Sequence, residues 1–127
     1  MARSATDLGY LACDQNDSAT AHSLFEEALA IFLELKHKRG IAKVLEGFAY
    51  LAAHQHNPER ALRLVGAASF LRQTIGAPRR QGEDAKLDAA LEAAWNNGGS
   101  AAARATWAAG WRMRLEDAIQ YAVAGTP

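Results

Sequence analysis

The residues able to do chemistry are few and stand apart in the sequence. Cys13 is the single cysteine, and no base lies near it that would activate a thiolate for nucleophilic attack. His54 and His56 diverge at the end of a helix, because each helical residue turns by about 100°. No cysteine or carboxylate cluster adds the further ligands that a metal site needs. The sequence therefore predicts no catalytic residue, no metal site and no cofactor, and we expect that the chain is not an enzyme.

Two similar stretches forty positions apart form the strongest pattern in the chain. YLACDQND begins at Tyr10, and YLAAHQHN begins at Tyr50. On helices, each tyrosine shares a face with polar residues one turn away, and Cys13 falls on the same face. Two interpretations stay open at this point: the rings bind a partner, or they pack as filler between neighbouring helices. The predicted face consists of residues that we expect to be partly exposed and close together, namely Tyr10, Asp14, Lys43, Glu46, Tyr50 and His54.

Composition sets the class of protein. The chain has 127 residues, half of them apolar and 22% charged, which fits one globular domain. Lys plus Arg and Asp plus Glu number 14 each, so the net charge of zero gives no reason to expect direct binding to nucleic acid or to a membrane. The N-terminal stretch lacks the apolar core of a signal peptide, and no apolar run approaches the roughly 18 residues that span a bilayer. We expect a cytoplasmic protein.

Apolar periodicity and capping residues predict an all-α domain over residues 1–127, with no strand. Asp17 and Asn57 are expected to cap helix N-termini, and Pro58 to occupy the first position of a helix. Gly40 is expected to follow the end of one helix, and Gly110 to break another. The predicted helices, about seven in number, cover residues 4–15, 17–36, 41–54, 58–75, 83–96, 100–109 and 115–124.

The helices group into two repeats, about 4–39 and 41–77, followed by capping helices over about 83–124. Antiparallel helices approach closely only where small residues meet, with a bulky residue filling the seam. The matching pairs are Gly9 with Ala49, Ala12 with Ala52, Ala21 with Ala61, Phe25 with Val65, and Ala28 with Ala68. This ladder resembles the tetratricopeptide repeat, whose usual length is about 34 residues against forty here. The resemblance implies helical hairpins in a short right-handed superhelix.

A closer resemblance rests on longer segments. FEEAL from Phe25, KRGIA from Lys38, IGAP from Ile75 and LEDAI from Leu115 are similar to the C-terminal tetratricopeptide-like region of large bacterial ATPase transcriptional regulators of the LuxR type. The similarity covers about residues 8–123, but Arg114 stands where the relatives often have Ser or Thr. The sequence has no Gly-x-x-x-x-Gly-Lys-Ser/Thr phosphate loop and no recognisable DNA-reading helix. The resemblance implies a non-catalytic protein-interaction module, similar to the sensor end of such a regulator.

In tetratricopeptide proteins, the face that carries the two tyrosines lines a concave groove that binds peptides. The resemblance therefore makes the six residues of that face a predicted groove for a protein or peptide partner. The alternative function is a small-molecule effector domain, with a pocket near Tyr50 and the tryptophans. A large closed apolar pocket would favour the effector function, whereas an open polar groove would favour peptide binding.

The first helix raises the question of self-association. Leu8 and Leu11 are apolar, and in a repeat array a preceding unit would cover them. An uncovered apolar face tends to find a partner, and two-fold pairing is the commonest solution. We expect a homodimer that buries the first hairpin.

The repeat alignment itself can be tested at its small residues. Ala28 and Ala68 are expected to be buried where paired helices meet. Ala68→Leu should overpack that seam and lower the free energy of unfolding by about 1–3 kcal/mol. Thermal and urea denaturation measure the change. Unchanged stability would count against the alignment.

Overall fold

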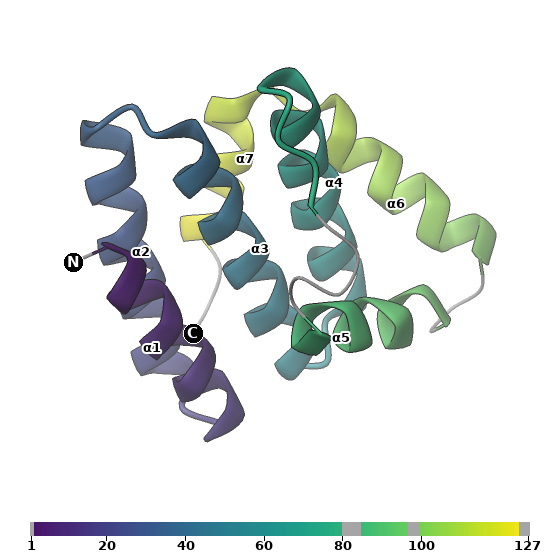
Figure 1. Cartoon of the computed structure of the whole chain (residues 1–127). Coiled ribbons are helices and arrows are strands. Elements are labelled where there is room, and N and C mark those ends of the chain that lie inside the picture. Colours follow the sequence, from purple (N-terminus) through teal and green to yellow (C-terminus); the bar gives the residue numbers. More distant parts are fainter. Residues whose placement is uncertain (1, 80–84, 97–99, 125–127) are drawn as a thin grey trace.

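The computed structural model describes residues 2–79, 85–96 and 100–124, and these residues form seven α-helices and no strand (Figure 1). The predicted all-α class and the number of helices are therefore confirmed. The predicted start of the fifth helix at Glu83 lies outside the described residues. None of the described helices is both long and apolar enough to cross a bilayer. The helices are α1 (Ala2–Asp14), α2 (Ser18–Glu34), α3 (Lys38–His54), α4 (Pro58–Thr74), α5 (Ala85–Asn96), α6 (Ser100–Arg112) and α7 (Leu115–Val123).

The ends of the first four helices repeat the same turn. Each turn has a left-handed residue with φ between 54° and 68°. After α1, the Asp17 N–H donates to the Ala12 carbonyl at 2.8 Å, and the equivalent bond recurs at 2.9 Å in the three later turns. These bonds satisfy carbonyl groups that a helix end would otherwise leave unpaired. The left-handed residues stand at intervals of twenty residues, at Asn16, Lys36, His56 and Gly76.

The residue after each of the first three left-handed residues is the N-cap of the next helix. Asp17 and Asn57 accept from the backbone N–H groups three residues ahead, both at 3.2 Å, so both predicted caps are confirmed. Pro58 is the first residue of α4, as expected. At the turn between α2 and α3, His37 caps the next helix in the same way, because its Nδ1 accepts from the Gly40 N–H at 2.8 Å. The forty-residue repeat is thus two units of twenty residues, each a helix followed by the same turn.

The prediction that Gly40 follows the end of a helix is wrong. Gly40 lies inside α3 and is buried, and the left-handed residue of that turn is Lys36. A Cβ at Gly40 would lie 2.3 Å from the Phe32 ring. Glycine is therefore needed here for close contact between α2 and α3, and the cations before it belong to the turn and to the first turn of α3.

Small residues let the helices of each hairpin approach one another, as predicted. Ala28 and Ala68 are both fully buried, which confirms their expected burial. In the first hairpin, α1 packs on α2 and also on α3. A Cβ at Gly9 or at Gly47 would come within 2.4 or 2.6 Å of the Phe25 ring, which is itself fully buried. Phe25 thus fills the space between three helices, and the glycines leave room for it.

The last three helices cover α4. The helices α5, α6 and α7 all contact it, and α6 makes the most extensive contact of the three. The prediction that Gly110 breaks a helix is wrong, because α6 runs through it to Arg112. A Cβ at Gly110 would lie 1.9 Å from the Arg63 carbonyl oxygen, and a Cβ at Gly66 would lie 2.1 Å from the Trp107 carbonyl oxygen. The two glycines bring the backbones of α4 and α6 into direct contact.

Gly110→Ala should therefore destabilise the protein. Within an unhindered helix the change would gain about 1 kcal/mol in helix propensity. Here we expect a loss of about 1–3 kcal/mol in the free energy of unfolding, because the added methyl group meets backbone that cannot rotate away. Urea denaturation measures the change in the free energy of unfolding. Arg104→Ala, at an exposed position of the same helix, is the control and should change stability by less than about 0.5 kcal/mol. Equal values for the two variants would contradict the helix contact.

Candidate functional site

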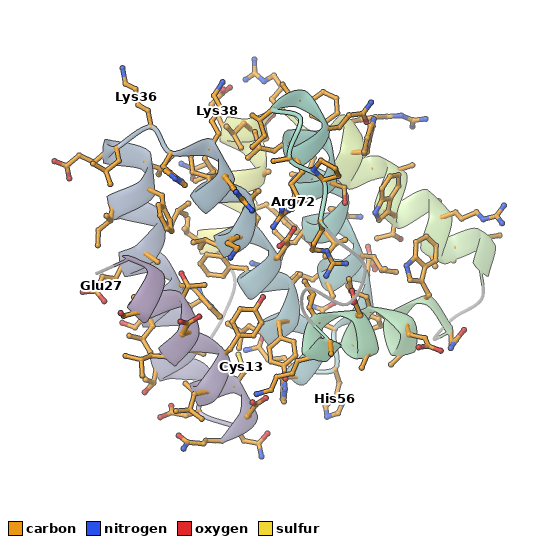
Figure 2. The ribbon with its side chains drawn as sticks, in the orientation of Figure 1. Cys13, Glu27, Lys36, Lys38, His56 and Arg72 are labelled. Carbon is orange, nitrogen blue, oxygen red and sulfur yellow. The ribbon has the colours of Figure 1, made fainter. Side chains whose placement is uncertain are left out.

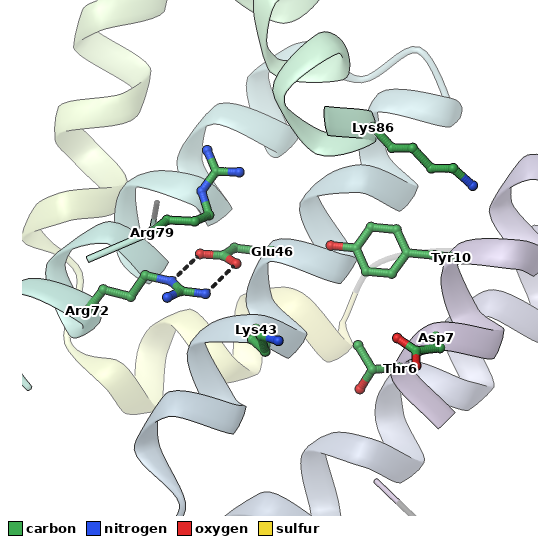
Figure 3. Close-up of a pocket in the computed structure, with 8 residues that line it drawn as sticks. All are labelled: Thr6, Asp7, Tyr10, Lys43, Glu46, Arg72, Arg79 and Lys86. Atoms are coloured by element: carbon green, nitrogen blue, oxygen red, sulfur yellow. Dashed lines mark hydrogen bonds and ion pairs between the residues drawn. The ribbon is translucent and has the colours of Figure 1, made fainter. Parts of the chain in front are cut away.

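Two cavities meet on one side of the helical stack. The first has a volume of about 300 Å³ and lies between α1, α3 and the segment after α4, with Lys86 of α5 at its edge (Figure 3). The second has a volume of about 480 Å³ and continues along α4 as far as Trp111 of α6. Both are lined by Glu46, Arg72 and Arg79, which form their common boundary. We call the two cavities together the groove.

A buried ion pair forms the floor of the groove. Glu46 accepts two hydrogen bonds from the Arg72 guanidinium, at 2.6 Å from Nε and 3.0 Å from Nη2 (Figure 3). Their side chains are only 8% and 4% exposed. Arg72 Nη1 also donates to the Ala77 carbonyl at 3.1 Å. The bonds to Glu46 connect α3 to α4, and the bond to Ala77 holds the segment that leads from α4 to Arg79.

Tyr10 and Lys43 are two of the accessible residues that line the first cavity. Tyr10 is half-buried, with its ring 4.9 Å from that of Tyr50 and 5.8 Å from that of Phe25. Its hydroxyl points toward the middle of the cavity in Figure 3, above the exposed Lys43. The ring is thus held by packing on one side and presents its polar end to the cavity. Such a side chain suits binding, because it offers a large contact area without a large loss of conformational entropy.

Asp14 joins three helices beside the groove. Its Oδ1 accepts from the Tyr50 hydroxyl at 2.6 Å, and its Oδ2 accepts from Lys86 Nζ. His54 Nε2 lies 3.5 Å from Oδ1. The hydrogen bond from Lys86, and next that from Tyr50, hold the pKa of Asp14 below its usual range. This cluster connects α1, α3 and α5, so it helps to set the width of the groove.

The structure divides the six predicted residues into two groups. Tyr10, Lys43 and Glu46 line the first cavity. Asp14, Tyr50 and His54 form the adjoining cluster instead. All six were expected to be partly exposed, which is wrong for Glu46 and Tyr50, each 6% exposed. The carboxylate of Glu46 is covered by Arg72 of α4, and the Tyr50 ring by Tyr10 and His54. Tyr50 packs between helices, as the filler interpretation has it.

The six predicted residues leave out five others that line the first cavity, namely Thr6, Asp7, Arg72, Arg79 and Lys86. Arg79 approaches Asp88 of α5, with Nη1 2.8 Å from Oδ1. Arg72 could have been noticed from the twenty-residue spacing of the turns. Two positions equivalent to it in earlier helices are the buried Ala12 and Ala52. A cation at a position that is otherwise buried requires a buried carboxylate, which Glu46 supplies. Arg79 and Lys86 flank residues 80–84, so no helical register links them to the repeats.

Cys13 was expected on the groove face, and this is wrong. Its side chain is 1% exposed and belongs to the core. Burial raises the pKa of the thiol to about 12, with a smaller contribution from the charge of Asp14. The thiol is therefore protonated at neutral pH and is not poised to act as a nucleophile. Among the described residues, no group of three or more His, Cys, Asp and Glu side chains could hold a metal ion.

Two of the three tryptophans lie together on α6. Trp107 and Trp111 stack on α6 with ring centroids 5.1 Å apart, and the Phe70 ring meets Trp111 edge-on at 5.2 Å. Tyr50 lines neither cavity of the groove, whereas Trp111 lines the far end of the second one. Neither cavity of the groove therefore has both Tyr50 and a tryptophan among its described lining residues.

No family model, no curated protein and no solved structure matches this chain. The resemblance to tetratricopeptide regions of bacterial regulators thus stays a prediction from the sequence. The described contacts are the basis for a functional proposal.

The buried ion pair gives a prediction about stability. Glu46→Ala leaves the Arg72 charge buried without its carboxylate, so it should lower the free energy of unfolding by about 3–5 kcal/mol. The double variant Glu46→Leu, Arg72→Met removes both charges at similar volume and should recover most of that loss. Urea denaturation of the three proteins measures both effects. A double variant as unstable as Glu46→Ala would contradict the assignment of Glu46 and Arg72 as a buried ion pair.

Asp14 gives a prediction about pH. A carboxyl group whose pKa is lower in the folded protein stabilises the fold above its ordinary pKa of about 3.9. That contribution is lost as the pH falls through the lowered value. We therefore expect Asp14→Asn to be less stable than the parent protein at neutral pH, with the difference shrinking in acid. Tyr50→Phe, which removes one of the two hydrogen bonds, should show a smaller difference of the same sign. Urea unfolding at several pH values tests this, and a difference independent of pH would contradict it.

Proposed function

We propose that this chain is a non-catalytic, cytoplasmic protein-interaction module that binds an extended segment of a partner protein in the groove. Its helical hairpins would form a short right-handed superhelix of the tetratricopeptide type, like the sensor end of a bacterial transcriptional regulator. The observation that carries the proposal is the groove itself, which is lined from α1, α3, α4 and α6. An extended peptide can contact several helices at once, whereas a small ligand would use only part of that surface.

The lining favours a peptide over an apolar effector. Charged side chains dominate the first cavity, and the buried Glu46–Arg72 pair gives it a rigid polar floor. Apolar pockets for small molecules are instead lined mainly by hydrophobic side chains, with a few polar groups. Tyr10 is the only aromatic side chain among the described residues that line the first cavity. Tyrosine and arginine are among the residue types enriched at the binding hot spots of protein interfaces.

The charges of the first cavity indicate the character of the partner. Its lining includes four cations, and two carboxylates on Asp7 and Glu46. The carboxylate of Glu46 is already paired with Arg72. Arg79 and Lys86 likewise lie beside Asp88 and Asp14, so among the described lining residues Lys43 and Asp7 carry the charges that remain for a partner. Lys43 favours a partner segment that carries an acidic residue. The cations are Lys43, Arg72, Arg79 and Lys86.

A random-peptide display library tests this function directly. We expect enrichment of peptides that contain acidic residues, with NMR shifts of the bound protein concentrated on α1, α3 and α4. Lys43→Glu should weaken the best peptide by about 1 kcal/mol or more, because it reverses a charge in the groove. Lys36→Glu makes the same charge change in the turn before α3 and should leave the affinity unchanged.

Two results would overturn the proposal. The first is a library that yields no specific peptide for the folded protein. The second is a set of peptides whose affinity falls equally with Lys43→Glu and with Lys36→Glu. Circular dichroism of each variant excludes unfolding as the cause of a lost signal.

We also propose that the module pairs with a second copy through its first hairpin. Leu8 and Leu11 of α1 are 51% and 49% exposed, whereas Phe48 and Leu51, forty positions later in α3, are 2% and 3% exposed. In α3 the difference comes from the preceding hairpin, since the Phe48 ring packs on that of Phe25 at 5.5 Å. No described helix covers α1 in the same way. A two-fold pairing would bury both leucines.

Light scattering after size exclusion at micromolar concentration tests the pairing. We expect twice the chain mass of 13.7 kDa for the parent protein. Leu11→Glu should give the mass of one chain with the helicity retained, because a buried carboxylate at the interface has no partner. Leu35→Glu, at a 67% exposed leucine in the turn after α2, is the control and should stay paired. A parent protein of single mass would overturn the homodimer.

A further inference from the structure

A separate cavity lies where α3 and α7 begin and α4 ends. Its volume is about 210 Å³, and none of its lining residues belongs to the groove. Lys38, at its edge, is seen at the start of α3 in Figure 2. We call this the α4–α7 cavity. Its apolar walls come from Ala67, Phe70, Leu71, Met113, Leu115 and Ala118.

The walls suit a small apolar body. A dry cavity of about 150 Å³ lined by Leu, Ile and Phe holds a benzene molecule. The α4–α7 cavity is somewhat larger, so a six-membered ring or a short alkyl chain fits it. Phe70 is 44% exposed although it is a large apolar residue, and the edge-on contact with Trp111 holds its ring in place. An apolar ligand would cover this exposed surface.

The rim of the cavity carries two cations at unfavourable positions. Lys38 is the first residue of α3, and Arg114 directly precedes α7 without making a side-chain cap. A helix N-terminus carries partial positive charge, so a cation there is disfavoured and an anion is favoured. No described residue forms an ion pair with Lys38. Arg114 is exposed and approaches only carboxylates of its own helix, Asp117 at 3.4 Å and Glu116 at 3.8 Å. A negative charge at the rim would complement both helix ends.

We propose that the α4–α7 cavity binds a small monocarboxylate whose apolar body is a ring or a chain of about six carbon atoms. The body lies against Phe70, Met113 and Leu115, and the carboxylate lies at the rim beside Lys38. The uncapped backbone N–H groups at the start of α7 add to the attraction for the anion. This site shares no lining residue with the peptide groove, so the proposal for it does not depend on the function of the groove.

Met113 provides a reporter inside the cavity. The chain has two methionines, Met1 and Met113, so labelling of methionine methyl groups with ¹³C gives two NMR signals. Hexanoate and phenylacetate are titrated into the labelled protein, with acetate, hexanol and 2-phenylethanol as comparison ligands. We expect a saturable shift of the Met113 signal with both carboxylates and none with acetate. The neutral alcohols should bind about three- to tenfold more weakly.

Variants separate the two parts of the proposal. Lys38→Gln should bring the affinity for hexanoate close to that for hexanol, while Lys36→Gln, two positions earlier, should not. Ala67→Leu fills the cavity and should abolish the shift, and circular dichroism shows whether that variant is folded. Peptide binding in the groove should be unchanged by Lys38→Gln. The proposal is overturned if Met113 shows no saturable shift, if acetate shifts it equally, or if Lys38→Gln and Lys36→Gln have the same effect.

Discussion

Direct contact between helix backbones is the constraint on which the rest of this structure depends. The chain is rich in alanine, and its helices can bury enough surface only by approaching closely where the side chains are small. Gly66 and Gly110 show the limit, since a methyl group on either would overlap a carbonyl oxygen of the opposite helix. Such contacts leave little freedom in the position of α4 and α6. They therefore also determine where Arg72, Phe70 and Trp111 can lie.

Polar contacts complement this packing by specifying which helices pair. The Glu46–Arg72 pair joins α3 to α4, and Asp14 joins α1 to Tyr50 of α3 and to Lys86 of α5. Burying the charges of Glu46 and Arg72 carries a large desolvation cost, so the gain in stability is small compared with the penalty for losing one partner. We infer that these contacts contribute mainly to specificity. An interface of alanines alone would allow neighbouring registers of similar energy, which the ion pairs exclude.

The same arrangement produces two surfaces of opposite chemistry. Along the groove, charged side chains of α1, α3, α4 and α5 converge because the helices present them toward a common side. At the start of α3 and α7, the turns instead leave apolar walls open between the helices, with cations at the rim. The groove offers charge over a long surface, whereas the α4–α7 cavity offers a small apolar volume. A partner segment and a small carboxylate would thus occupy separate places on one rigid scaffold.

The sequence by itself determined the helices, because their signals are local. Asp17 and Asn57 cap helices through side-chain bonds that span three residues, and the buried Ala28 and Ala68 follow from the repeat spacing alone. It also placed Tyr10, Lys43 and Glu46 on the face that lines the first cavity.

Only the tertiary structure decided which of these residues stay accessible. Gly40 and Gly110 resemble helix-ending residues locally, but each lies within a helix at a contact with another one. Glu46 and Tyr50 were correctly assigned to a face, yet Arg72, 26 residues from Glu46, and Asp14, 36 residues from Tyr50, engage their polar groups. Exposure depends on what packs from distant positions in the chain, and a helical period contains no information about that.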